Sequence, residues 1–572
     1  MDQEELNRSI ESLLEHVQKA PRYTGGEMNT AVKPWDSTPL RFAFCFPDTY
    51  EVGMSHLGMK IIYGAINNEP WSLCERVFMP WVDMVALMEK NRVPLFSLES
   101  RHALRDFDAV GFTLQYEMSY TNILAMLRLG GIPLESAQRG EEDPIVVAGG
   151  PCASNPEPLA DFIDAFLMGD GEELNLEINR VILDRKEQGF SRQECLRRLA
   201  EIEGVYIPAF YTVTYHEDGT IQSFAPNIPE AKLPIKKRFV KDLDKAYFPV
   251  EIPVPYTEII FDRMMLEIMR GCSRGCRFCQ AGMIYRPNRE RKLETVRRCA
   301  DRMLENTGQD DILLSSLSSS DYSCIREIAE HISDTYSAKK VKLNVPSLRI
   351  DAFSLDLMAK VQDVRRGSLT FAPEAGSQRL RDVVNKGITE EEILGGAREA
   401  FRGGWSRVKL YFMLGLPTET EEDRRAISDL ANRISAAYYE EVPKPRRNGR
   451  CRITVSTSFF VPKPFTPFQW APMYRPGDYL GFAATVNHAI YASHNHRSIQ
   501  YSWHDAEMIY LEGVLARGDR RAAALILEAY RRGARFDCWL ETWDFARWEQ
   551  AAANTGISMD FYALRQRGKE EI

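Results

Sequence analysis

The stretch LEIMRGCSRGCRFCQAG, residues 266–282, is the most informative part of this chain. Cys272, Cys276 and Cys279 lie within it in the spacing C-x3-C-x2-C. Three thiolates in so short a loop can bind three irons of a [4Fe–4S] cube. No fourth cysteine follows at short spacing, so the fourth iron would be open to a substrate or cofactor. A zinc site is the alternative, but zinc usually takes four closed ligands, and no nearby histidine supplies the fourth.

Size and composition indicate a globular protein of several domains. The chain has 572 residues, of which 44% are hydrophobic and 27% charged, with a formal net charge of −9. That length suits three or four domains. The N-terminus is acidic and amphipathic, unlike a signal or transit peptide, and no apolar run approaches the length of a membrane span. We therefore expect a cytoplasmic protein with no membrane partner, in which the other, scattered cysteines are free thiols.

The chain contains three local basic runs although its net charge is negative. They cover residues 236–238, 286–292 and 443–452. Each is expected to be a solvated loop. The runs leave an RNA or ribosomal substrate open as an alternative to a small molecule.

The N-terminal third alternates apolar strands with helices. Strands are expected at residues 40–47, 73–79, 107–114, 145–148 and 164–173. Such alternation predicts a parallel, doubly wound sheet covered on both faces, which binds ligands beyond the carboxyl ends of its strands. We assign residues 36–200 to this domain and residues 1–35 to a helical segment before it. Residues 201–255 are expected to form a hairpin, turning at Asp218-Gly219, and then a proline-rich linker.

The central part repeats a strand-then-helix pattern six times. The strands are expected to begin near residues 264, 311, 341, 367, 407 and 452, which predicts a partial (β/α)6 barrel over residues 256–474. In barrels of this kind the chemistry lies at the carboxyl ends of the strands, where the cysteine loop falls. Residues 475–572 are expected to form a helical cap whose tryptophans pack against the barrel.

The cysteine triplet, with Phe278 before its last cysteine, resembles the signature of the radical SAM superfamily. PSLR at residues 346–349 and GLPTET at residues 415–420 resemble the methylthiotransferase-type and YgiQ-type barrels more distantly. The resemblance implies a [4Fe–4S] cluster whose open iron chelates S-adenosylmethionine (SAM). An electron, supplied by a donor such as flavodoxin or ferredoxin, would then cleave SAM to a 5′-deoxyadenosyl radical.

The same resemblance implies a set of SAM contacts. Arg349 would pair with the methionine carboxylate, and Glu374 would accept hydrogen bonds from the ribose hydroxyls or the amine. Serines stand where the family usually holds the methionine amine with a glycine-rich, acidic pattern. The remaining contacts implied are Phe278, Ser316, Ser318, Ser377, Gly415 and Pro417.

An α/β domain ahead of such a barrel resembles the cobalamin-binding domain of cobalamin-type radical SAM proteins. Gly149, Gly150 and Gly169 would line the nucleotide tail of the corrinoid. Cobalamin mutases carry D-x-H-x-x-G, whereas the text around His56 lacks the Asp and has its glycine one residue early. We therefore expect cobalt without a histidine ligand.

The activity that this resemblance implies is radical SAM chemistry on an unknown substrate, with cobalamin-assisted methyl transfer as the expected outcome. Two alternatives stay open. One is a methylthiotransferase-like modification of RNA or protein without cobalamin. The other is a non-catalytic iron–sulfur protein with a vestigial barrel.

Overall fold

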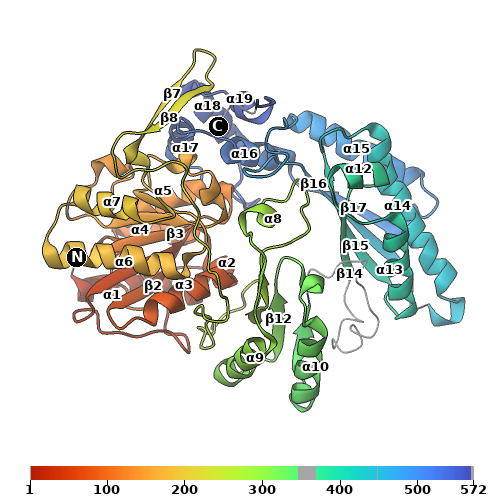
Figure 1. Ribbon diagram of the computed structural model, residues 1–572, viewed down its shortest axis with the longest axis horizontal. Coiled ribbons are helices and arrows are strands. Elements are labelled where there is room, and N and C mark those ends of the chain that lie inside the picture. The colour runs from red at the N-terminus through yellow and green to blue at the C-terminus, as the bar shows by residue number, and fades with distance from the viewer. Residues whose placement is uncertain (1, 346–368, 448, 569–572) are drawn as a thin grey trace.

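The computed structural model describes residues 2–345, 369–447 and 449–568. It confirms the α/β class, with an N-terminal parallel sheet, a partial barrel and a largely helical C-terminal part (Figure 1). The short helix α8 (Ala281–Ile284) lies between the N-terminal sheet and the sheet β14–β17 in this view. Among the described residues, no helix combines the length and apolarity needed to cross a bilayer.

The N-terminal sheet has the order β2-β1-β3-β4-β5-β6, and its first five strands are parallel. The strands are almost wholly buried because helices cover both faces, which explains their continuous apolar sequences. The strands are β1 (Leu40–Phe46), β2 (Ser72–Phe78), β3 (Ala109–Thr113), β4 (Ile145–Gly149), β5 (Ala165–Leu167) and the antiparallel β6 (Val205–Tyr206). The helices are α1 (Gln3–Leu14), α3 (Leu57–Asn67), α4 (Val82–Asn91), α5 (Tyr120–Leu129), α6 (Gly171–Gln188) and α7 (Arg192–Glu201).

The predicted hairpin is present as β7 (Tyr211–Tyr215) and β8 (Ile221–Pro226). The segment after it has little regular structure but is packed against the N-terminal sheet. The Arg238 N–H donates to the Met168 carbonyl at 2.8 Å, and the Asp170 N–H donates to the Arg238 carbonyl at 3.0 Å. This part of the linker therefore forms a wall of the N-terminal domain.

The barrel strands form two parallel groups, in the orders β13-β12-β9 and β14-β15-β16-β17. The strands are β9 (Met264–Glu267), β12 (Asp311–Ser315), β13 (Lys342–Asn344), β14 (Leu369–Glu374), β15 (Arg407–Leu414), β16 (Arg452–Phe459) and β17 (Ile499–Trp503). The helices around them are α9 (Leu293–Thr307), α10 (Ile325–Tyr336), α12 (Gln378–Val383), α13 (Glu390–Arg402), α14 (Glu421–Glu441) and α15 (Pro476–Ala492). All six expected strands occur.

The C-terminal part differs from expectation in two ways. It adds a seventh strand, β17, whose half-polar sequence IQYSW reflects its exposed edge position. The segment around residues 537–539 also packs on the N-terminal domain, where the sequence suggested contact with the barrel. Trp539 Nε1 donates to Asp48 at 3.0 Å, and Thr121 donates to Asp537 at 2.6 Å. The cap therefore joins the first and last parts of the chain. Its helices are α16 (Ala506–Ala516), α17 (Ala522–Arg531), α18 (Phe545–Thr555) and α19 (Met559–Ala563).

Candidate active site

The three cysteines lie in the loop between β10 (Met269–Arg270) and α8, and all three are free and half-buried. The pKa values of Cys276 and Cys279 are raised, chiefly by burial and further by the other thiols and by Glu374. Among the described residues, no three His, Cys, Asp or Glu side chains converge tightly enough to hold one metal ion. Each thiolate of a [4Fe–4S] cube binds a different iron. Three thiolates match the three protein-ligated irons of such a cube, whereas a closed zinc site takes four ligands.

The cysteine loop is held from two sides by barrel segments. The Arg277 N–H donates to the Val384 carbonyl at 2.9 Å, and Asn385 Nδ2 donates to the Gly275 carbonyl at 2.9 Å. On the other side, the Phe468 N–H donates to the Arg277 carbonyl at 3.3 Å. Phe278 packs on a small apolar cluster near the end of β14, which anchors the loop.

Glu374 lies beside the cysteines in a strained backbone conformation. Its φ is 68°, in the left-handed region, next to a register shift between β14 and β15. Lys386 Nζ donates to Glu374 Oε1 at 3.0 Å. Burial raises the pKa of Glu374 and Lys386 opposes the rise. Strain at a non-glycine residue is typical of functional positions, which supports a binding role for this carboxylate.

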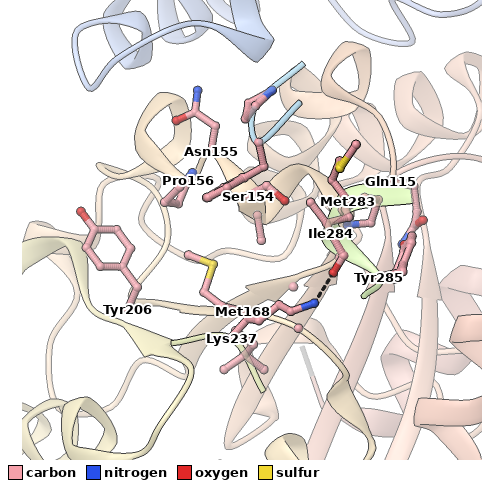
Figure 2. A pocket seen from close by; sticks show the side chains of 18 of the residues that line it. Gln115, Ser154, Asn155, Pro156, Met168, Tyr206, Lys237, Met283, Ile284 and Tyr285 are labelled. Carbon is pink, nitrogen blue, oxygen red and sulfur yellow. Dashed lines mark hydrogen bonds between the residues drawn. The ribbon is translucent and has the colours of Figure 1, made fainter. Parts of the chain in front are cut away.

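A cavity of about 1230 Å³ runs from the N-terminal sheet to the cysteine-bearing part of the barrel. This exceeds the roughly 300–1000 Å³ of usual small-molecule pockets, so the space suits a large cofactor or more than one ligand. Figure 2 shows part of its wall, with Gln115, Met168, Met283 and Tyr285 around the same space. Lys237 Nζ crosses this wall to donate to the Ile284 carbonyl at 2.6 Å.

At its N-terminal end the cavity opens at the point where the order of the parallel strands reverses, between β1 and β3. That is the usual ligand position in open α/β sheets. Gly149, Gly150 and Gly169 all line the cavity, as expected. Close packing also requires glycine at two of these positions. A Cβ at Gly150 would lie 2.8 Å from the Leu114 carbonyl oxygen, and a Cβ at Gly169 would lie 1.9 Å from the Arg238 carbonyl oxygen.

Comparison with known proteins identifies the family. Residues 58–208 match the family described as radical SAM proteins, N-terminal, and residues 266–431 match the radical SAM superfamily. The uncharacterized protein MJ0966 of Methanocaldococcus jannaschii is 30% identical over 380 residues, which are 66% of this chain and 71% of that protein. The chain belongs to the radical SAM superfamily.

Other relatives and structures are more distant. The putative methylthiotransferase MJ0865 of Methanocaldococcus jannaschii is 26% identical over 166 residues, 28% of this chain and 36% of that protein. A structure of the radical SAM methyltransferase TsrM from Kitasatospora setae, with cobalamin and a [4Fe–4S] cluster bound, is 17% identical with a TM-score of 0.46. It covers 75% of this chain and 76% of that one.

The serines that were expected to contact SAM differ from one another in their surroundings. Ser316 lines the cavity and shares a 3.0 Å hydrogen bond with Ser319. Ser318 is buried, and in the part of the chain that the structure describes its hydroxyl has no hydrogen-bond partner. Ser377 caps α12 by accepting from the Leu380 N–H at 3.1 Å. Ser377 is thus already engaged, whereas Ser316 and Ser318 remain predictions for SAM.

Two of the remaining expected contacts, Gly415 and Pro417, lie in the turn after the fifth barrel strand. Gly415 has φ of 79°, and a Cβ there would lie 2.6 Å from the Tyr479 ring, so close packing requires the glycine. Pro417 is half-buried in the same turn. Arg349 lies outside the described residues. The roles of these three residues toward SAM stay predictions.

His56 caps helix α3 and faces the cavity. Its Nδ1 accepts the Met59 N–H at 3.1 Å, and burial lowers the pKa of the ring to about 4. The neutral ring with Nδ1 as acceptor carries its proton on Nε2. Binding of a metal through Nε2 would require the ring to move its proton to Nδ1 and to lose the hydrogen bond from Met59.

Sequence reasoning missed a buried charge network between the two domains, centred on Arg270 beside the cysteine loop. Arg270 pairs with Asp170 at 3.2 Å, Glu172 at 2.6 Å and Glu267 at 3.1 Å. Arg289 pairs with Asp170 as well, and Arg291 pairs with Glu267. The two residues of an ion pair in this network are up to 119 residues apart in the sequence, so no local pattern predicts them. The network fixes the Gly-Asp-Gly loop of the N-terminal sheet against the first barrel strand.

Proposed function

We propose that this radical SAM protein catalyses cobalamin-assisted methyl transfer, with the corrinoid in the cavity between its two α/β parts. The main observation in support of this proposal is that the cavity is continuous. Residues at the carboxyl ends of β1, β3 and β4 and residues beside the cysteine loop line one space. A corrinoid at the sheet and SAM at the cysteine loop would therefore face the same substrate.

Cys272, Cys276 and Cys279 would hold the cluster, which when bound supplies the electron that cleaves SAM. The Gly282 N–H donates to Cys279 Sγ at 3.3 Å, and hydrogen bonds to the sulfurs tune such clusters. Glu374 would orient SAM through charge-assisted hydrogen bonds, while Lys386 keeps that buried carboxylate paired.

The N-terminal end of the cavity would hold the corrinoid through backbone and amide groups. Gly149, Gly150 and Gln115 line this end, and Thr113 Oγ1 accepts from Gln115 Nε2 at 2.6 Å. A bound corrinoid would supply a cobalt-held methyl group. His56 would stay in its capping position, because ligation through Nε2 would require moving its proton to the nitrogen that accepts from Met59.

An RNA substrate has less support than the sequence suggested. In the first basic run, Lys237 and Arg238 bind the Ile284 carbonyl and Glu177 within the molecule. In the second, Arg289 and Arg291 belong to the buried charge network. The run at residues 443–452 is mostly exposed where the structure describes it, and Arg286 and Lys292 of the second run are exposed as well. We therefore propose a small or peptide substrate ahead of RNA.

The test is anaerobic reconstitution with iron, sulfide and hydroxocobalamin, followed by removal of unbound corrinoid. The retained corrinoid is then quantified, and SAM cleavage is followed as 5′-deoxyadenosine formed with dithionite. Retention near one corrinoid per chain together with 5′-deoxyadenosine is expected. Formation of 5′-deoxyadenosine without retained corrinoid would leave a radical SAM enzyme whose sheet is structural.

A further inference from the structure

The outer face of the cysteine loop carries exposed arginines. Arg274 and Arg277 lie within the loop, and Arg286 lies just after α8; all three are exposed. A Cβ at Gly275 would be 3.6 Å from Arg286 Nη2, so the Arg286 side chain folds back against the loop. We call the exposed surface formed by Arg277 and Arg286 the arginine face.

The two arginines of this face are positioned by backbone carbonyls. Arg277 Nη1 donates to the Val383 carbonyl at 2.6 Å, and Arg286 Nε donates to the Gly282 carbonyl at 2.9 Å. Carbonyl bonds fix a guanidinium in place but leave its charge uncompensated. Within residues 2–345, 369–447 and 449–568, neither arginine has a carboxylate at ion-pair distance.

Neighbouring charges leave the arginine face positive. Asp321 pairs with Arg274 and cancels its charge, whereas Asp382 accepts from the neutral Gln378 Nε2 at 2.8 Å and keeps its own, so the two guanidinium groups of Arg277 and Arg286 outnumber it. The patch is therefore basic on a chain whose formal net charge is −9.

The location of this charge matters because electrons must enter the cluster from outside. Arg277 lies between Cys276 and Cys279 in the loop, so its exposed side chain is within three residues of two proposed cluster ligands. The cavity reaches the loop region through Met283 and Tyr285, and neither Arg277 nor Arg286 is among the residues that line it. A protein docked on the arginine face would approach the cluster without blocking the substrate space.

We propose that the arginine face is the docking site of a small acidic one-electron carrier protein. The inference rests on the proposed function, because only a cluster-bearing enzyme needs this electron. Opposite charge steers association and sets orientation, with a strong dependence on salt. In each encounter the carrier loses one electron and the cluster gains it, with no other bond made or broken.

The experiment uses the reconstituted protein and an acidic plant-type ferredoxin as the probe. Binding of the oxidised ferredoxin is titrated at low and at high salt. The ratio of ferredoxin-supported to dithionite-supported SAM cleavage is measured in parallel. The test variant is Arg277→Gln/Arg286→Gln, and Arg277→Lys/Arg286→Lys keeps the charge. The matched control is Arg450→Gln/Arg452→Gln, because both arginines are exposed and Arg452 begins β16, at the opposite end of the barrel strands.

The Gln variant is expected to weaken ferredoxin binding about tenfold at low salt, to flatten its salt dependence and to lower the cleavage ratio by a similar factor. The Lys variant and the control should bind as wild type does. Unchanged binding in the Gln variant would overturn the proposal, and so would weakening confined to the control. If dithionite-supported cleavage falls with the ferredoxin-supported rate, so that the ratio is constant, the arginines serve the cluster itself and the docking proposal is wrong. Absence of 5′-deoxyadenosine from the wild type with dithionite would instead refute the proposed function.

Discussion

Replacing Arg270 by Met should destabilise the protein strongly, because it breaks three buried ion pairs at once. The Arg270 side chain is 12% exposed, and its partners Asp170, Glu172 and Glu267 are 7%, 5% and 10% exposed. Removing one partner from a buried pair typically costs about 3–5 kcal/mol, since it leaves an uncompensated charge. Arg289 and Arg291 still pair with two of the carboxylates, so we expect a loss of about 3 kcal/mol in the free energy of unfolding.

The pH dependence of this loss has a definite sign. Burial raises the pKa values of Asp170 and Glu267, but Arg270 and the other arginines outweigh burial and lower both. Carboxylates with lowered pKa stabilise the fold above their ordinary values, 3.8 and 4.5, and lose that contribution as pH falls through the lowered values. The difference between wild type and Arg270→Met should therefore narrow in acid.

Guanidinium denaturation followed by tryptophan fluorescence, at pH 7 and near pH 3, measures this effect. Arg425→Met is the matched control, because Arg425 forms an exposed pair with Glu421 and should cost at most about 0.5 kcal/mol. An Arg270→Met protein as stable as the control variant at pH 7 would refute the reasoning. A difference that widens in acid would refute it too.

Three further substitutions probe the site. Cys276→Ala should abolish the visible absorbance of the iron–sulfur cluster and with it SAM cleavage; an intact cubane in this variant would mean that another ligand is used. Glu374→Ala should keep the cluster but weaken SAM binding, measured by equilibrium dialysis, by about 1–3 kcal/mol, the loss expected for charge-assisted hydrogen bonds; unchanged affinity would make Glu374 only the partner of Lys386. Gly169→Ala should displace the segment around Arg238 and reduce corrinoid retention, at a cost of about 1–3 kcal/mol in stability, because its Cβ would lie 1.9 Å from a backbone oxygen; wild-type retention and stability would show that this wall can shift freely.

Strong local patterns in the sequence predicted the architecture. The apolar strands of the N-terminal sheet are buried on both faces, so their composition identified them without tertiary information. The Asp218-Gly219 turn identified its hairpin in the same way. β17 was missed because an edge strand with exposed polar residues lacks such a pattern.

The site was predicted only as far as local motifs reach. The cysteine triplet has a spacing that stands by itself, and Glu374 was found through its motif. Two other contacts could not be predicted. Lys386, which pairs with Glu374, lies twelve residues after it, beyond a helix, and Arg270 pairs with carboxylates of another domain. Contacts of this kind depend on the tertiary fold, which brings residues distant in sequence together. The role of Gly169 was similarly hidden, since the backbone that requires it is that of Arg238.

The most direct test of the two-cofactor cavity is the spectrum of the corrinoid retained by the wild type and by His56→Ala. Both proteins are reconstituted with hydroxocobalamin, and visible and paramagnetic resonance spectra are recorded after reduction to Co(II). The account predicts a retained corrinoid whose cobalt shows no histidine nitrogen and whose spectra are the same in the two proteins, since His56 Nδ1 caps α3. A protein that retains no corrinoid, or a spectrum that changes in His56→Ala, would contradict it.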